Sequence, residues 1–217
     1  VADILRKRRV GNTVTYVVNR NINFTNVCIK QCGFCAFSRD FREEEGYLLP
    51  IEEITRRAKE AYHYGASEVC IQAGLPPDMD GHLYENICKE IKNQIPNIHI
   101  HGFSPEEILY GATRLEVSPE EFLLRLKEAG VDTIPGTSAE ILNQKLRDKI
   151  SPGRITVDDW TNIIKTAHKL GNVIVGLLTD SAIATYKKLP HLDYRQREIV
   201  VKNIKYVGKV VPQNSLD

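Results

Sequence analysis

Short apolar runs alternate with amphipathic segments along this chain, and this alternation restricts the fold more than any other feature. The apolar runs have the length of strands and occupy residues 16–24, 68–72, 97–101, 131–134 and 172–178. Segments with apolar side chains at helical spacing occupy residues 50–65, 83–94, 137–149 and 160–170. Because strands and helices that alternate in this way form parallel βαβ units, we predict an α/β fold with a parallel sheet.

Two helix starts carry a serine–proline–glutamate–glutamate signal, at residues 104–107 and 118–121. The serine hydroxyl accepts a hydrogen bond from the backbone of the first turn, and the second glutamate can return to the serine N–H. Thr137 and Glu140 have the spacing of a further capping box, which predicts that a helix begins at Thr137.

Three cysteines, Cys28, Cys32 and Cys35, follow the first predicted strand with the spacing C-x3-C-x2-C. Such a loop can bind three irons of a 4Fe–4S cubane and leave the fourth iron open to a small molecule. A structural zinc site needs a further Cys or His at finger-like spacing, which is missing, and three thiols cannot all pair as disulfides. We predict an iron–sulfur cluster, with zinc or reduced thiols as the alternatives. Cys70 and Cys88 are predicted to be buried, apolar side chains without a ligand role.

Charge and composition narrow the functional classes. Lysine and arginine nearly balance aspartate and glutamate, so the net charge of +1 favours neither nucleic acid nor an anionic membrane. No apolar run is long enough to cross a bilayer, no signal-peptide pattern is present, and the cysteine spacing fits a reducing compartment. We therefore expect a cytoplasmic protein without nucleic-acid or membrane partners.

The sequence around the cysteines resembles a known family. The chain resembles the radical SAM superfamily in three features: the opening strand, the cysteine spacing with Phe34 before the last cysteine, and the repeated βα units. Within it, the chain resembles the tyrosine-utilising 4-hydroxyphenyl transferases of deazaflavin (FO) synthesis, over about residues 1–171. The matching stretches are residues 16–39, 68–77, 99–107 and 135–140. The resemblance implies a parallel (β/α) radical SAM barrel at residues 1–178, incomplete with about five βα units, and a divergent tail at residues 179–217.

The resemblance also implies an activity. Enzymes of this family join the 4-hydroxybenzyl group of L-tyrosine to 5-amino-6-(D-ribitylamino)uracil, with a 4Fe–4S cluster and S-adenosyl-L-methionine as cofactors. It further implies an electron donor and a second radical SAM subunit that closes the ring. Two alternatives remain open: an aminofutalosine-synthase-like step of menaquinone synthesis, and an inactive Fe–S-binding remnant of a truncated chain.

Four further residues receive cofactor-binding roles from the resemblance alone. The backbone of Phe34 is expected near the adenine, and Glu140 near the ribose hydroxyls. Gln72 and Gly74 stand where the superfamily often has a Gly-Gly-Glu run that contacts the methionine amino group. Each residue also has a structural interpretation: Phe34 as packing, Gln72 to Gly74 as a strand-end turn with an unusual glycine dihedral, and Glu140 as a helix cap.

His99 and His101 are two residues apart on a predicted strand, so their side chains point to the same side of the sheet. If that side is the interior of the barrel, both are candidates to contact the phenol or the pyrimidine of the substrates. Structural histidines with polar neighbours are the alternative. Asn23 and Ser104 are weaker candidates of the same kind.

Overall fold

The computed structural model describes residues 4, 7–8, 11, 16–30, 32–40, 45–171, 175–178 and 210–213. The chain divides into two compact units: Val18–Asn172, and Val1–Val17 together with Val173–Asp217. In the described part of the chain, no helix combines the length and the apolar character that crossing a membrane requires.

The larger unit contains a three-stranded parallel sheet in the order β1-β2-β3, as the alternation of runs predicts. Its strands are β1 (Asn19–Ile22), β2 (Glu68–Ile71) and β3 (His99–His101). The strand predicted at residues 131–134 is reduced to a single bridge between Thr133 and His101. The carboxylate of Asp132 accepts the N–H of Ile100 (2.8 Å), which a backbone carbonyl would accept in a regular ladder. The segment therefore pairs in parallel with β3 where the strand is predicted, but over one bridge only.

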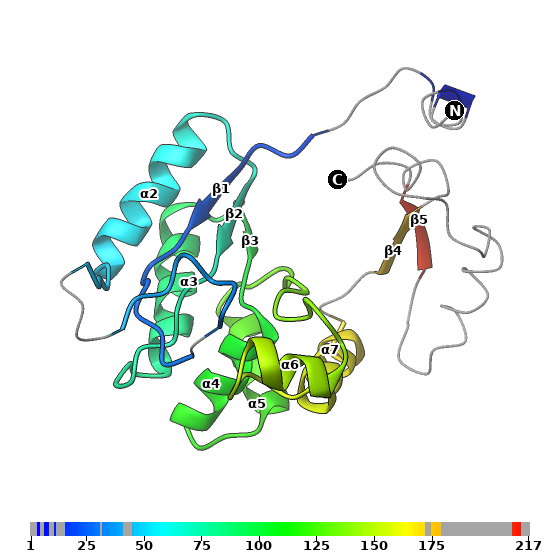
Figure 1. Ribbon diagram of the computed structural model, residues 1–217. Helices are drawn as coiled ribbons and strands as arrows, with labels where there is room; N and C mark the ends of the chain where they lie inside the picture. Colours follow the sequence, from blue (N-terminus) through cyan, green and yellow to red (C-terminus); the bar gives the residue numbers. More distant parts are fainter. Residues whose placement is uncertain are drawn as a thin grey trace. The chain divides into compact units, whose positions relative to one another are not determined.

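Helices cover one face of this sheet. Figure 1 shows α2 (Ile51–His63) and α3 (His82–Gln94) side by side along the strands, and the two helices pack on each other. Val69 and Ile71 are fully buried, whereas Cys70 between them is half-buried on the opposite face. This alternation indicates that one face of the sheet lies against the core and the other does not.

The carboxyl-terminal half of the larger unit is helical. It contains α4 (Pro105–Arg114), α5 (Pro119–Glu128), α6 (Gln144–Ile150) and α7 (Val157–Lys169), and α7 packs on both α4 and α5. Beneath them lies a buried cluster of rings, Phe24, Tyr84, Phe103 and Phe122, whose edge-to-face contacts have centroid distances of 4.7–6.5 Å. Such aromatic packing fixes the positions of β1 and of the helices α3, α4 and α5.

The structure confirms the predicted caps at Ser104 and Ser118 but not the one at Thr137. Ser104 forms the complete capping box with Glu107, and the Ser118 hydroxyl accepts the N–H of Glu121. The helix predicted from Thr137, however, begins only after Asn143, so Glu140 is not part of a capping box. Both Ser138 (φ 68°) and Glu140 (φ 22°) have positive φ, which a right-handed helix does not allow.

The second unit contributes two described strands. β4 (Val175–Leu178) and β5 (Val210–Gln213) pair in parallel and form a sheet of their own. β4 falls within the strand predicted at residues 172–178. The rest of the divergent tail predicted at residues 179–217, other than β5, lies outside the described residues.

Candidate functional site

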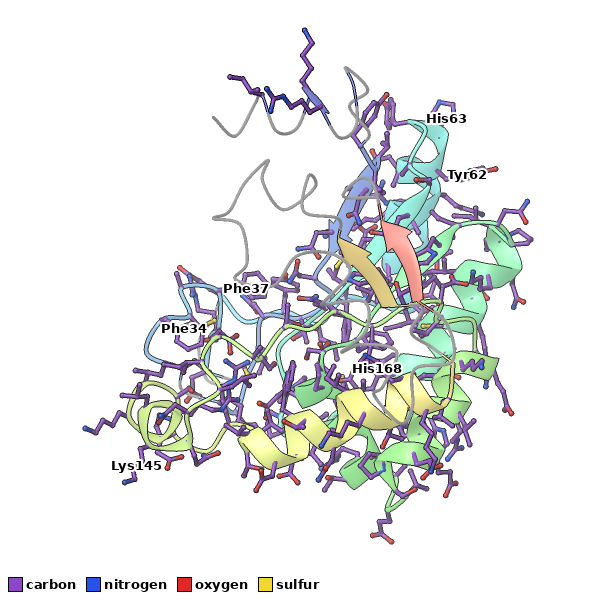
Figure 2. The ribbon with its side chains drawn as sticks, turned by 90° about the vertical axis from the view of Figure 1, so that its right-hand side faces the viewer. Phe34, Phe37, Tyr62, His63, Lys145 and His168 are labelled. Carbon is purple, nitrogen blue, oxygen red and sulfur yellow. The ribbon has the colours of Figure 1, made fainter. Side chains whose placement is uncertain are left out.

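A cavity of about 280 Å³ opens beyond the carboxyl ends of β1 and β2, where parallel α/β folds place their chemistry. Seven of the predicted site residues line it: Cys28, Cys32, Phe34, Cys35, Gln72, Gly74 and Glu140. Figure 2 shows Phe34 and Phe37, which both line the cavity, far from Tyr62 and His63 at the carboxyl end of α2. The cysteine loop therefore lies at the opposite edge of the sheet from the end of α2.

The cysteine loop is held between two other segments. The N–H of Ile29 donates to the carbonyl of Leu75 (2.8 Å), in the loop after β2. The N–H of Gly33 donates to the carbonyl of Ile150 (2.8 Å), at the end of α6. These backbone hydrogen bonds fix the loop between β2 and α6 without using a cysteine side chain.

The three thiols have different surroundings. Burial raises the pKa of Cys32, although Arg154 opposes the effect. For Cys35, burial also raises the pKa, but hydrogen bonds from Ser38 and Phe37 outweigh burial and lower it below the usual value. A lowered thiol pKa favours the thiolate, which is the form that binds iron.

The three cysteines of the loop surround one cavity. In the described residues, no three His, Cys, Asp or Glu side chains converge closely enough to hold one metal ion. A cubane binds each thiolate through a different iron, so its ligands are spread around one space, as Cys28, Cys32 and Cys35 are around this cavity. Cys70 and Cys88 do not line the cavity, and Cys88 is fully buried on α3.

Gly74 allows the loop after β2 to approach the cysteine loop. A Cβ at this position would lie 2.2 Å from the carbonyl oxygen of Val27, and the Gly74 N–H donates to Thr25 (2.9 Å). Gly74 does not have a positive φ, so the unusual dihedral predicted for it is wrong. The close backbone contact is what requires glycine here.

We expect Gly74→Ala to destabilise the protein by about 2 kcal/mol, because the added methyl group overpacks a contact between two backbones. Gly136→Ala is the control, since a Cβ there meets nothing within 4 Å. Gly136 is close to the cavity in sequence, because Thr137, which lines the cavity, follows it. Urea unfolding of both variants measures the effect. Equal stability of the two variants would contradict this account of Gly74.

Glu140 faces an arginine that the sequence interpretation missed. The Glu140 carboxylate lies 2.9 Å from Nη1 of Arg154, whose Nε is 3.4 Å from the carboxylate of Glu106. The Arg154 guanidinium also lies over the Phe34 ring, 5.6 Å from its centroid. Lys30 adds a second positive charge, 3.5 Å from Glu106. The cavity thus combines cations and carboxylates, and the Pro-Gly turn before Arg154 gave no signal of this role.

Glu107 is a second wall residue that sequence reasoning interpreted only as a cap. One carboxylate oxygen accepts the N–H of Ala73 (2.9 Å), and the other accepts the N–H (2.8 Å) and the hydroxyl (2.6 Å) of Ser104. Glu107 therefore connects the loop after β2 to the start of α4, and burial raises its pKa to about 7. Asn23 and Ser104, the weaker candidates, also line the cavity.

His99 and His101 are not brought to this cavity. His99 Nε2 lies 2.8 Å and His101 Nδ1 2.6 Å from the same hydroxyl, that of Thr133. Both histidines are on the face of the sheet opposite the buried Ile100, so they point to the same side as predicted.

Sequence comparison identifies relatives of the chain. The family profile described as "Radical SAM superfamily" matches residues 22–182. A "5-amino-6-(D-ribitylamino)uracil--L-tyrosine 4-hydroxyphenyl transferase" of Methanothermobacter thermautotrophicus is 46% identical over 170 residues, which cover 78% of this chain and 46% of the relative. An "FO synthase" of Streptomyces avermitilis is 47% identical over 171 residues, 79% of this chain and 20% of the relative. The chain thus spans about half the length of the transferase and a fifth of the synthase.

Two solved structures are similar in fold. The crystal structure of methylornithine synthase (PylB) matches 97% of this chain and 58% of its own, with a TM-score of 0.57 and 21% identity. The structure of HydG, a maturase of the [FeFe]-hydrogenase, matches 97% of this chain and 45% of its own, with a TM-score of 0.58 and 16% identity. At these identities the likeness concerns the fold alone.

Proposed function

Because this chain belongs to the radical SAM superfamily, we propose that its cysteine-lined cavity binds a 4Fe–4S cluster and S-adenosyl-L-methionine. The observation that carries the proposal is the position of Cys28, Cys32 and Cys35 around one cavity, together with Phe34 and Glu140. When bound, the cluster supplies the electron that cleaves adenosylmethionine into methionine and a 5′-deoxyadenosyl radical. The cavity supports this proposal beside the sequence motif, since it also collects polar groups from the loop after β2, from α4 and from the loop before α6.

The residues of the cavity have complementary roles in this proposal. The three cysteines are the cluster ligands, and Gln72 with the loop carbonyls faces the methionine amino group. Glu140 accepts hydrogen bonds from the ribose hydroxyls, because a carboxylate has two oxygens for a diol. Phe34 offers an apolar surface to the adenine, and Arg154 supplies positive charge for the methionine carboxylate.

The proposed reaction is the transfer of the 4-hydroxybenzyl group of L-tyrosine to 5-amino-6-(D-ribitylamino)uracil, in FO synthesis. Relatives whose names state this reaction are 42–48% identical to the chain, which supports it. The chain's contribution is to hold the reactants in order and to exclude water from the reacting carbon atoms. An external electron donor and a second radical SAM subunit for ring closure complete the proposal.

Anaerobic reconstitution tests this function. The chain is loaded with iron and sulfide, reduced, and mixed with adenosylmethionine, tyrosine and the ribitylaminouracil, and the products are separated by chromatography. We expect 5′-deoxyadenosine together with the 4-hydroxybenzyl adduct. Cleavage of adenosylmethionine without the adduct would contradict the substrate pair and direct attention to an aminofutalosine-type reaction. A clustered protein that yields neither product would be an inactive remnant.

We expect Glu140→Gln to weaken adenosylmethionine binding about tenfold, because the amide keeps only one acceptor oxygen for the ribose diol. Folding stability should change little, since Glu140 is not a cap in this structure. Glu60→Gln is the matched control: it also removes a carboxylate paired with an arginine (Arg20, 2.6 Å), on α2 and outside the cavity. Equilibrium dialysis gives the affinities. A loss of stability with unchanged affinity would exclude the ribose role.

A further inference from the structure

We infer that Arg147 is a positioning residue that holds in place the two loops carrying Glu140 and Arg154. Arg147 does not line the cavity, and its side chain is 2% exposed. Its guanidinium spans the gap between the loops: Nη1 donates to the carbonyls of Ser138 (2.8 Å) and Ala139 (3.0 Å), and Nη2 donates to the carbonyl of Ile155 (2.8 Å). One side chain therefore connects the segment before α6 to the segment after it.

The two connected segments are those that present charge to the cavity. Glu140 lies between Ala139 and Ile141, whose carbonyls both accept hydrogen bonds from Nη1 of Arg147 (3.0 and 3.3 Å). Arg154 immediately precedes Ile155. Because the neighbours of both residues are fixed to the same guanidinium, the 2.9 Å contact between Glu140 and Arg154 depends on Arg147.

The loop before α6 needs such support. Ser138 and Glu140 both have positive φ, a region that non-glycine residues adopt only when the surroundings hold them there. Residues 137–143 form no regular secondary structure that would pair their carbonyls. The planar guanidinium presents N–H groups on separate nitrogens in fixed directions, so it can satisfy carbonyls from both segments at once, whereas the donors of a lysine all lie on one nitrogen.

Charge acts in the same direction as the hydrogen bonds. The Glu140 carboxylate lies 3.9 Å from Nη1 of Arg147 and 2.9 Å from Nη1 of Arg154. The buried Arg147 thus attracts the Glu140 carboxylate from behind the cavity wall, while Arg154 pairs with the same carboxylate in the cavity. Among the described residues, Nε of Arg147 is buried and has no hydrogen-bond partner, so the side chain is held entirely through its terminal nitrogens.

This inference rests on the proposed adenosylmethionine site, and the experiment separates the two. In cluster-reconstituted protein, we expect Arg147→Gln and Arg147→Lys each to weaken adenosylmethionine binding at least fivefold, with unchanged iron content. Glu140→Gln combined with Arg147→Gln should weaken binding by less than the product of the two single effects, because Arg147 acts in part through Glu140 and in part through Arg154. Arg114→Gln is the control: Arg114 also donates to loop carbonyls, those of Met79 and Pro77, which do not line the cavity.

The single tryptophan provides a readout of the loop itself. Trp160 on α7 donates from Nε1 to the carbonyl of Thr137 (3.1 Å), at the start of the loop that Arg147 holds. Release of the loop should therefore increase acrylamide quenching of Trp160 about twofold in Arg147→Lys, but not in Arg114→Gln. This measurement needs neither bound adenosylmethionine nor activity.

The outcomes are distinct. If the wild-type protein carries its cluster but does not bind adenosylmethionine, the proposed site fails, and the quenching result alone decides the role of Arg147. If the wild type binds and Arg147→Lys binds equally well with unchanged quenching, the inference is overturned. If Arg147→Gln does not fold, Arg147→Lys carries both measurements, because it keeps the positive charge and loses only the planar arrangement of donors.

Discussion

We expect each of the variants Cys28→Ala, Cys32→Ala and Cys35→Ala to abolish binding of the cluster. All three thiols line the same cavity, and a cubane with only two protein thiolates loses one of its three anchored irons. Cys70→Ala and Cys88→Ala should keep the full iron content, because neither thiol lines the cavity. These two controls test whether the loss is specific to the loop or follows from any missing thiol.

Iron and sulfide are measured per chain after anaerobic reconstitution of the five variants. For Cys88→Ala, we expect a small loss of stability only, about 1 kcal/mol, since the buried sulfur is removed and the Cβ methyl group remains. A full cluster in Cys32→Ala would disprove the ligand assignment. Loss of the cluster in Cys70→Ala would show that a thiol outside the cavity takes part.

The parallel α/β fold and the family were predicted from sequence and are confirmed. Helices α2 and α3 were predictable because their apolar residues recur at helical spacing and face one sheet. The start of α7 was predicted three residues late, because the cap formed by Thr156 with the N–H of Asp159 went unnoticed. Of the five strands predicted, four form as β1, β2, β3 and β4, and the run at residues 131–134 contributes a parallel bridge to β3.

The errors concentrate where tertiary contacts replace local ones. The sequence from Thr137 to Glu140 matches a capping box, but the buried Arg147 takes the carbonyls that a helix would need. Local patterns cannot reveal an arginine seven residues further on that folds back onto this loop. In the same way, the capping signal at Glu107 was correct but incomplete, since the same carboxylate also accepts the N–H of Ala73, 34 residues away.

Glu107 should make the stability of the protein depend on pH. Burial raises its pKa from 4.5 to about 7, so the folded protein binds a proton between these values that the unfolded chain releases. Stability therefore falls as pH rises through this window, and 1.36 kcal/mol per pKa unit gives a loss of about 3 kcal/mol. Above pH 7 the Glu107 carboxylate is charged in the folded and in the unfolded protein, and the loss of stability is complete.

Glu107→Gln removes the titrating group, so the stability of the wild type relative to this variant should fall by about 3 kcal/mol between pH 4.5 and pH 8. Urea unfolding of both proteins without cluster, at several pH values, measures this difference and cancels the other titrating groups. Glu121→Gln is the control, because Glu121 occupies the same position in α5 and is exposed. If the difference between wild type and Glu107→Gln stayed constant with pH, the hydrogen bonds from Ala73 and Ser104 would outweigh burial. Glu107 would then remain a charged connection between the loop after β2 and α4 at every pH tested.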